Sequence, residues 1–239
     1  MKGAWDPDRV LQAIHSLGTP DEEPWVRDLL GEHADLLASA RHVADIALLA
    51  PPAAQERLAA VGSVLNRNQR DYSTIGERHV CEGAVVGDTL EANGASFGCV
   101  IAVGAAQMPL EAFRKLAQFA ASGGRLVFVE PAPRRGKSAE ETEALAEMWP
   151  GLLDAKHVAI VADAQQCLTV LNRWLPPDVW LDEPCDSLVY CHREAEGRHL
   201  YLFVNCSEEP LERAVMLRGG AETREVRLLL GAREGRLVA

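Results

Sequence analysis

The stretch KLAQFAASGGRLVFVE, from Lys115 to Glu130, contains the clearest structural signal in the chain. An amphipathic helical pattern ends at Gly123-Gly124, and an apolar run follows at once. A glycine just past a helix adopts the left-handed conformation that closes the helix C-terminus. Phosphate-binding loops have the opposite order, strand first and helix second, so that helix N–H groups face the anion. We therefore predict that the glycine pair only turns the chain from helix to strand.

On both sides of this stretch, short apolar runs alternate with amphipathic helical patterns. The apolar runs lie at 43–50, 98–104, 125–130 and 157–161, and the helical patterns at 53–68, 109–122, 138–149 and 163–175. Such alternation implies strand–helix–strand crossovers and a parallel sheet with helices on both faces. We predict a doubly wound α/β domain over residues 43–176, with a small hairpin or ribbon around Gly87-Asp88.

The two ends of the chain have different patterns. Apolar spacing predicts a helical lead-in over residues 1–42, with one helix at 6–17, a break at Gly18-Thr19-Pro20 and a second helix at about 24–41. After Pro176-Pro177, residues 177–239 contain four alternating, β-rich runs with no helix between them. A hairpin turn is predicted at Ala195-Glu196-Gly197, and a second turn at Gly219-Gly220-Ala221. This tail predicts an antiparallel sheet or half of a β-sandwich.

Composition excludes several classes of partner. The 239 residues have a formal charge of −11 and a pI near 5.1, whereas nucleic acids and anionic membranes favour basic surfaces. No apolar run approaches the ~20 residues that cross a bilayer, and the first ten residues lack the apolar core of a secretion signal. We therefore expect a cytoplasmic protein that binds neither nucleic acid nor membrane.

The six cysteines show no CxxC motif and no zinc-type spacing. We interpret them as buried, reduced thiols, although Cys185 and Cys191 are spaced to close a small disulfide loop. His192 and His199 lie in one predicted hairpin, but the sequence offers no evident third ligand at a suitable spacing. We therefore predict no metal ion.

The connections that follow the predicted parallel strands are where a ligand would bind in such a sheet. The connections after the first two strands, 50–54 and 104–109, contain neither GxGxxG nor GxxxxGK[ST], and no GxSxG nucleophile elbow occurs there. We predict no nucleotide or flavin cofactor. A candidate ligand cleft would be lined by Pro51, Gln107 and Glu130. The alternative is that Glu130 is only a solvated carboxylate beside Pro131.

Asp182 and Glu183 are the candidates for the carboxylate pair that glycosidic chemistry uses. Such a pair needs two carboxyl groups about 5–10 Å apart. Asp182 and Glu183 are adjacent in sequence, and neighbouring side chains on an extended loop point apart. We therefore predict no catalytic residue.

The order of these segments nevertheless resembles part of a known enzyme class. The run ADIALLAPP, the segment DYSTIGE at 71–77, the helix–strand pair at 110–129 and the tail residues Arg193, Gly197, Tyr201, Phe203 and Asn205 carry the likeness. Together they resemble a region of large multidomain glycoside hydrolases of the α-L-rhamnosidase-like and β-galactosidase-like types. The sequence departs from that pattern at Ser73, Gly76 and Phe97, where the family has two acidic residues and a tyrosine.

The resemblance implies a glutamine-amidotransferase-like, flavodoxin-like domain followed by a β-sandwich portion. In such enzymes these regions are accessory to a catalytic (β/α)₈ barrel of roughly 250 residues, for which this chain has no room. The resulting hypothesis is a non-catalytic C-terminal portion of a hydrolase in carbohydrate metabolism, which packs against the barrel or self-associates. Two alternatives stay open: a free-standing small-ligand or carbohydrate-binding module, and an independent hydrolase.

Overall fold

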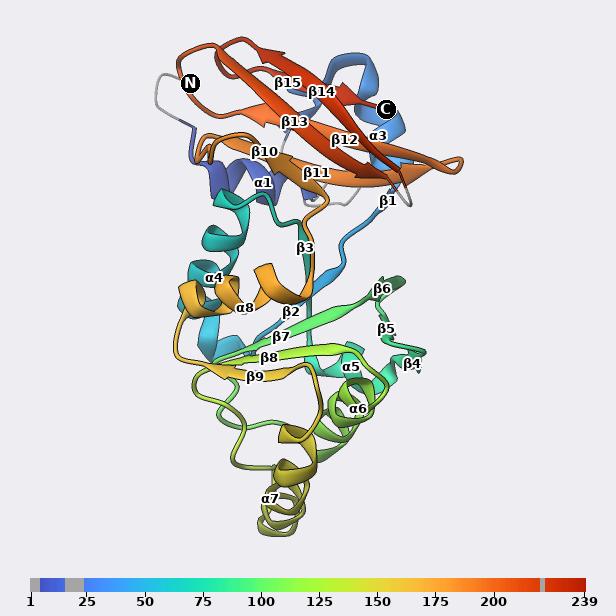
Figure 1. Ribbon diagram of the computed structural model, residues 1–239, viewed down its shortest axis with the longest axis vertical. Helices are drawn as coiled ribbons and strands as arrows, with labels where there is room; N and C mark the ends of the chain where they lie inside the picture. The colour runs from blue at the N-terminus through green and yellow to red at the C-terminus, as the bar shows by residue number, and fades with distance from the viewer. Residues whose placement is uncertain (1–4, 16–23, 220–221) are drawn as a thin grey trace. The chain divides into compact units, whose positions relative to one another are not determined.

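The computed structural model describes residues 5–15, 24–219 and 222–239 (Figure 1). The chain divides into two compact units. The first, the β unit, comprises Met1–Val43, Leu65–Asp71 and Pro177–Ala239. The second, the α/β unit, comprises Ala44–Val64 and Tyr72–Pro176. The short segment Leu65–Asp71 therefore belongs to the β unit although the residues on either side of it belong to the α/β unit.

A five-stranded parallel sheet forms the centre of the α/β unit, in the order β3-β2-β7-β8-β9. Its strands are β2 (Ile46–Leu49), β3 (Tyr72–Ile75), β7 (Cys99–Val103), β8 (Arg125–Val129) and β9 (Val158–Val161). Every side chain of β2 and β7 is buried, as expected for a parallel sheet covered on both faces. The parallel sheet predicted from the apolar runs is confirmed.

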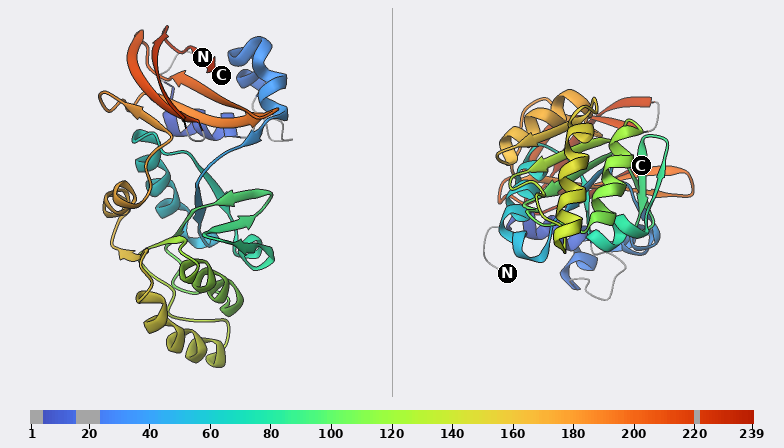
Figure 2. Two further views of the ribbon diagram at one scale, coloured as in Figure 1. Left: turned by 45° about the vertical axis from the view of Figure 1, so that its right-hand side comes forward. Right: turned by 90° about the horizontal axis from the view of Figure 1, so that it is seen from below.

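Helices lie on both sides of this sheet, with α4 and α8 on one side and α5, α6 and α7 on the other (Figure 1). The helical segments are η2 (Pro52–Ala54), α4 (Gln55–Arg67), α5 (Glu77–Glu82), α6 (Leu110–Ala121), α7 (Ala139–Leu153) and α8 (Ala164–Trp174). Helices α6 and α7 lie side by side (Figure 2). Phe113 of α6, Phe128 of β8 and Trp149 of α7 meet in one aromatic group, so these helices share a core with the sheet.

The glycine pair is a helix terminator, as the sequence predicts. The N–H of Gly123, with φ +100°, donates to the Ala120 carbonyl, and the N–H of Gly124 donates to the Phe119 carbonyl. This pair of hydrogen bonds is the Schellman arrangement that ends helices. A Cβ on Gly124 would lie 2.2 Å from a ring carbon of Phe119, so the second position also requires glycine for space.

A three-stranded antiparallel ribbon, β4-β5-β6, follows α5. Its strands are β4 (Ala84–Val86), β5 (Thr89–Ala92) and β6 (Ala95–Phe97). Val86 pairs with Thr89, and Gly87 at φ +59° makes the turn between them. The hairpin predicted at Gly87-Asp88 is therefore present.

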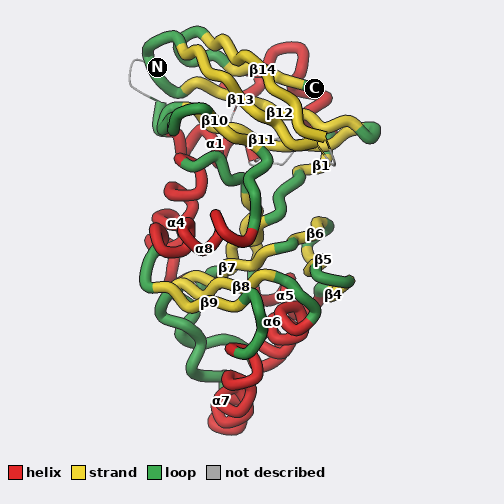
Figure 3. The backbone as a smooth tube through the Cα atoms, in the orientation of Figure 1, coloured by secondary structure: helices red, strands yellow, loops and turns green. Residues whose placement is uncertain are grey.

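Two antiparallel sheets form the β unit, in the orders β1-β11-β12-β15 and β10-β13-β14. The strands are β1 (Arg41–His42), β10 (Val179–Leu181), β11 (Leu188–Ala195), β12 (Arg198–Asn205), β13 (Leu211–Gly219), β14 (Glu222–Leu230) and β15 (Gly235–Val238). The long hairpins β11–β12 and β13–β14 are drawn in yellow in Figure 3. Side chains from both sheets, among them Tyr190, Phe203 and Leu228, fill one shared core.

The predicted tail hairpins have different outcomes. Glu196 and Gly197, both at positive φ, turn β11 into β12, as the sequence predicts. The predicted turn at Gly219-Gly220-Ala221 falls largely outside the described residues, although Gly219 and Glu222 pair across it. Strands β10 (three residues) and β15 (four residues) were not predicted from the sequence.

The single helix predicted at 24–41 is wrong. The structure has α2 (Pro24–Leu30), η1 (Gly31–His33) and α3 (Ala34–Ser39), followed by β1. Gly31 at φ +53° interrupts the helix, and Ala40 is already extended. The first helix, α1 (Pro7–His15), is present, and the predicted break at Gly18-Thr19-Pro20 lies outside the described residues. Among the described residues, no helix has both the length and the apolar character needed to cross a bilayer.

Candidate functional site

The predicted cleft residues Pro51, Gln107 and Glu130 follow the carboxyl ends of the adjacent strands β2, β7 and β8. They therefore share one edge of the parallel sheet. Gln107 and Glu130 are exposed and held by local hydrogen bonds: Gln107 Nε2 donates to the Gly136 carbonyl at 2.9 Å, and the Glu130 carboxylate accepts from the Ala132 N–H at 2.8 Å. A ligand at this edge stays a prediction.

The other residues weighed from the sequence have local roles. Asp182 and Glu183 are both exposed, and Asp182 Oδ1 accepts a hydrogen bond from the Glu183 N–H at 2.9 Å. His192 Nε2 lies 2.9 Å from His199 Nδ1, while its other ring nitrogen lies 3.2 Å from Asp178. The two histidines thus contact each other directly, and the carboxylate lies on the opposite side of the His192 ring. These donor atoms do not converge on one point.

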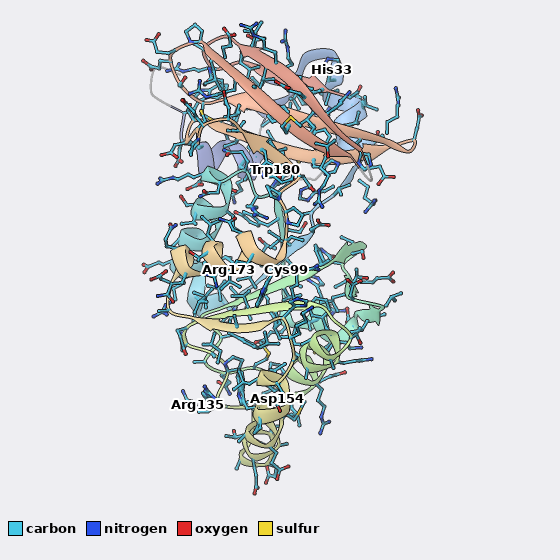
Figure 4. The ribbon with its side chains drawn as sticks, viewed as in Figure 1. His33, Cys99, Arg135, Asp154, Arg173 and Trp180 are labelled. Carbon is cyan, nitrogen blue, oxygen red and sulfur yellow. The ribbon has the colours of Figure 1, made fainter. Side chains whose placement is uncertain are left out.

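None of the six cysteines forms a disulfide, and five of them are buried, with Cys81 half-buried. Cys99, labelled in Figure 4, is enclosed at the start of β7. Burial raises the pKa of Cys167 and of Cys206 to about 12 each, so both remain protonated at neutral pH. One thiol, Cys191, has a different environment.

Cys191 forms a compact polar cluster with His15, His42 and Asp71, inside the β unit. One donor atom from each of these four side chains lies within 4.8 Å of the others. His15 Nε2 lies 2.9 Å from Asp71 Oδ1, and His42 Nε2 lies 2.9 Å from Asp71 Oδ2. We call these four residues the His–Asp–Cys cluster.

Four separate elements bring these side chains together. His15 is the last residue of α1, His42 ends β1, Asp71 ends the Leu65–Asp71 segment, and Cys191 lies in the middle of β11. On β11 the neighbouring residue Tyr190 faces the core between the two sheets. Because successive side chains of a strand point to opposite faces, Cys191 faces the other side, where α1 and α3 contact β11.

Arg193 shares that face and fixes the backbone that carries the two histidines. Its guanidinium is buried and donates to four carbonyls, those of Ile14, His15, Leu37 and Ala40, at 2.9–3.2 Å. The carbonyls at a helix C-terminus lack partners within the helix and carry partial negative charge, which a cation satisfies. One side chain therefore anchors the ends of α1 and α3.

Mutual charge sets the protonation of the cluster. Burial raises the pKa of Asp71, but the charges of His42 and His15 and their hydrogen bonds outweigh it and hold that pKa well below its usual range. Burial lowers the pKa of His15 and of His42, but the Asp71 carboxylate outweighs it, so the pKa of His15 is raised and that of His42 is raised well above its ordinary value. Burial raises the pKa of Cys191, whereas His42 and hydrogen bonds from both histidines lower it to about 6.

This cluster was missed in the sequence. Its members are separated by 27, 29 and 120 positions (15 to 42, 42 to 71, 71 to 191), whereas short motifs report only residues that are close along the chain. The sequence carries no local signal for Asp71 either, because β3 after it has no apolar run and because its burial, at 5% exposure for the residue, is visible only in the structure. Imidazole, carboxylate and thiolate together make a set of donors suited to a transition metal or to thiol chemistry.

No protein-family model matches the chain, and no curated protein matches its sequence. Solved structures do match its fold. The rhamnosidase from Novosphingobium sp. PP1Y has a TM-score of 0.65 and 23% identity, over 90% of this chain and 24% of that one. This structure and the two described next are of glycoside hydrolases.

Two further matches extend the comparison. The β-galactosidase from Bacillus circulans sp. alkalophilus has a TM-score of 0.59 and 11% identity, over 88% of this chain and 43% of that one. The α-L-fucosidase isoenzyme 2 from Paenibacillus thiaminolyticus has a TM-score of 0.55 and 11% identity, over 87% of this chain and 50% of that one. The present chain thus spans between a quarter and half of the length of these enzymes, and the likeness is one of fold.

Proposed function

We propose that the chain serves as a non-catalytic accessory portion of a glycoside hydrolase. The observation that carries the proposal is coverage: 90% of this chain matches only 24% of the rhamnosidase, and the β-galactosidase and fucosidase matches are also partial. A segment that recurs beside larger enzyme bodies of different sugar specificity has the distribution expected of a support rather than of the site that selects the sugar.

The arrangement of strands supports the finer fold assignment. If only the five parallel strands are numbered, from 1 to 5 in chain order, the sheet order β3-β2-β7-β8-β9 becomes 2-1-3-4-5. This is the strand order of flavodoxin-like folds. The two antiparallel sheets share one apolar core, as the layers of a β-sandwich do. We assign the α/β unit to the amidotransferase-like variety on the strength of the sequence resemblance.

The accessory role would be exerted by packing on the catalytic barrel or by self-association. Asp182, Glu183 and Glu130 are exposed, and the carboxylates of Asp182 and Glu130 accept local backbone hydrogen bonds, which is why we assign no catalytic carboxylate among them. The six free thiols fit a reducing, cytoplasmic location. Binding of carbohydrate would be secondary to this role.

The test is a mixing experiment with a matching catalytic barrel domain of a glycoside hydrolase. We expect the two polypeptides to co-elute in size-exclusion chromatography and the barrel to withstand heating better in the complex, since binding to the folded state stabilises it by mass action. Separate elution of a monomeric chain, together with unchanged barrel stability, would contradict the proposal.

The second candidate function, a free-standing carbohydrate-binding module, rests on the shared sheet edge of Pro51, Gln107 and Glu130. Isothermal titration with rhamnose, galactose, fucose and their oligosaccharides decides it. Saturable heat that is lost in Glu130→Gln and kept in Glu143→Gln would favour the module. Titrations that show no binding heat with any of these sugars would exclude the carbohydrate-binding module.

A further inference from the structure

We propose that the His–Asp–Cys cluster binds one zinc ion, which ties together four separate segments of the β unit. The ligands are His15 Nε2, His42 Nε2, one carboxylate oxygen of Asp71 and Cys191 Sγ. This inference is independent of the accessory role, because it concerns only contacts within the β unit.

The donor atoms already converge. Two ligands on a tetrahedral zinc, at bond lengths of about 2.0–2.3 Å, lie roughly 3.3–3.6 Å from each other. Both histidine nitrogens lie 2.9 Å from Asp71 oxygens, and the four donor atoms fall within 4.8 Å of one another. The nitrogen–oxygen pairs therefore need to separate by only a few tenths of an ångström, and the most distant pair needs to approach by about 1 Å, for the four donors to surround an ion.

Charge balance also favours a dication. An aspartate and a thiolate carry two negative charges, and two neutral imidazoles add none, so zinc makes the buried centre neutral. The Asp71 side chain is 1% exposed and Cys191 is fully buried, where uncompensated charge is costly. The mixture of imidazole, thiolate and carboxylate is one that zinc accepts more readily than calcium or magnesium, which prefer oxygen alone.

Hydrogen bonds around the cluster orient its ligands, as is usual around protein metal ions. The His192 N–H donates to Asp71 Oδ2 at 2.8 Å, and the Asp71 N–H donates to the Tyr190 hydroxyl at 3.1 Å. Arg193 holds the carbonyl of His15 at 3.2 Å. The carboxylate and backbone of Asp71 and the backbone of His15 are thus held in place before any ion arrives.

The geometry points to a structural ion instead of a catalytic one. Four protein ligands complete a tetrahedral shell, whereas catalytic zinc sites keep a position for water. A thiol nucleophile paired with histidine is the competing use of the same side chains, but the sulfur of Cys191 is enclosed at 0% exposure. The histidine side chains, 20% and 19% exposed, provide the path by which an ion enters.

The experiment begins with metal content. The untagged full chain, purified after growth in zinc-supplemented medium and passed over a desalting column, is assayed by plasma mass spectrometry. We expect about one zinc per chain, and removal with a strong chelator lowers the midpoint of thermal unfolding, which zinc then restores. A wild-type chain that holds no zinc and takes up none in a titration overturns the proposal, whatever the variants do.

Cobalt(II) then identifies the ligands, because a cysteine ligand gives a sulfur-to-cobalt charge-transfer band in the near ultraviolet. Cys191→Ser should abolish that band, and His42→Ala should weaken zinc binding more than 100-fold, beyond the ~10–100-fold typical of changes outside the ligand shell. Cys206→Ser, another buried free thiol of the same unit, is the matched control and should keep the band.

Folding of each variant is checked by circular dichroism before titration. Binding that is unchanged in both Cys191→Ser and His42→Ala would show an adventitious ion elsewhere and contradict the assignment. Rapid alkylation of Cys191 by iodoacetamide in the zinc-loaded native chain would contradict it too, since a coordinated, enclosed thiolate is protected.

Discussion

Asp71 is the residue on which the His–Asp–Cys cluster depends most. Its carboxylate contacts both histidine rings and accepts the His192 N–H, and it is almost entirely enclosed. The sequence shows only an aspartate in a polar stretch, and nothing local reveals that residues 15, 42 and 191 will meet it. At this scale the candidate site was not predictable, because its members are brought together only by tertiary folding.

We expect Asp71→Asn to destabilise the metal-free chain by about 3–5 kcal/mol, because removing one partner of a buried ionic group leaves the others uncompensated. Urea unfolding in the presence of chelator measures the change. Asp35→Asn is the control. Asp35 pairs with Arg27 on the surface, with its side chain 95% exposed, so this substitution should lower the free energy of unfolding by less than about 1 kcal/mol. Equal losses in the two variants would show that the buried contacts contribute no extra stability.

The same carboxylate gives a pH dependence on the acid side. The pKa of Asp71 is lowered in the folded chain, so its contribution to stability is present above its unfolded value of about 3.9 and is lost as pH falls below it. His15 and His42, whose pKa values are raised, add no pH dependence in this acid range, because both rings are protonated there in the folded and in the unfolded chain. Between about pH 5 and pH 2, metal-free wild type should lose stability more steeply than Asp71→Asn, as measured by urea midpoints; parallel curves would contradict this.

At the scale of elements, the sequence was informative wherever local chemistry decides the structure. The parallel strands could be predicted because both of their faces are apolar, and the end of α6 because Gly123-Gly124 closes it. The prediction failed for β3, whose Tyr72, Ser73 and Thr74 are partly or fully exposed at the sheet edge and give no apolar run. It failed again at β1, because this strand has only two residues and its partner β11 lies about 150 positions further along the chain.

The helix terminator gives a paired test. Gly124→Ala should cost about 1–3 kcal/mol, because the new methyl group would overlap the Phe119 ring. Gly151→Ala should instead stabilise by about 0.4–1 kcal/mol, since it lies within α7 with nothing within 4 Å of the added carbon. Thermal unfolding distinguishes the two, and a neutral Gly124→Ala would show that the turn does not need glycine.

Arg193 supplies a second test at this scale. Arg193→Lys should lower the free energy of unfolding by about 3 kcal/mol or more. An ammonium group cannot reach all four carbonyls at the ends of two helices, and the carbonyls that lose their donor stay buried without a hydrogen bond. Arg198→Lys, in the same hairpin but exposed, should change the free energy of unfolding by less than about 0.5 kcal/mol. Similar urea midpoints for both variants would contradict a capping role for Arg193.

At the scale of the whole molecule, the chain is two compact units built from interleaved segments, and its fold matches parts of larger enzymes. The α/β and antiparallel classes followed from the sequence, since the change from helix-alternating to strand-only pattern at Pro176-Pro177 is visible there. The return of Leu65–Asp71 to the β unit was not predictable, because the residues at 65–71 lie at the end of a regular helical pattern.

The measurement that tests the accessory role most directly is the glycosidase activity of a matching catalytic barrel domain, followed during heating with and without this chain. Nitrophenyl rhamnoside, galactoside and fucoside serve as substrates. We expect the chain alone to release no nitrophenol and to prolong the activity of the barrel at the temperature where the barrel alone is inactivated. Turnover by the purified chain alone, or identical inactivation of the barrel in both mixtures, would contradict the account.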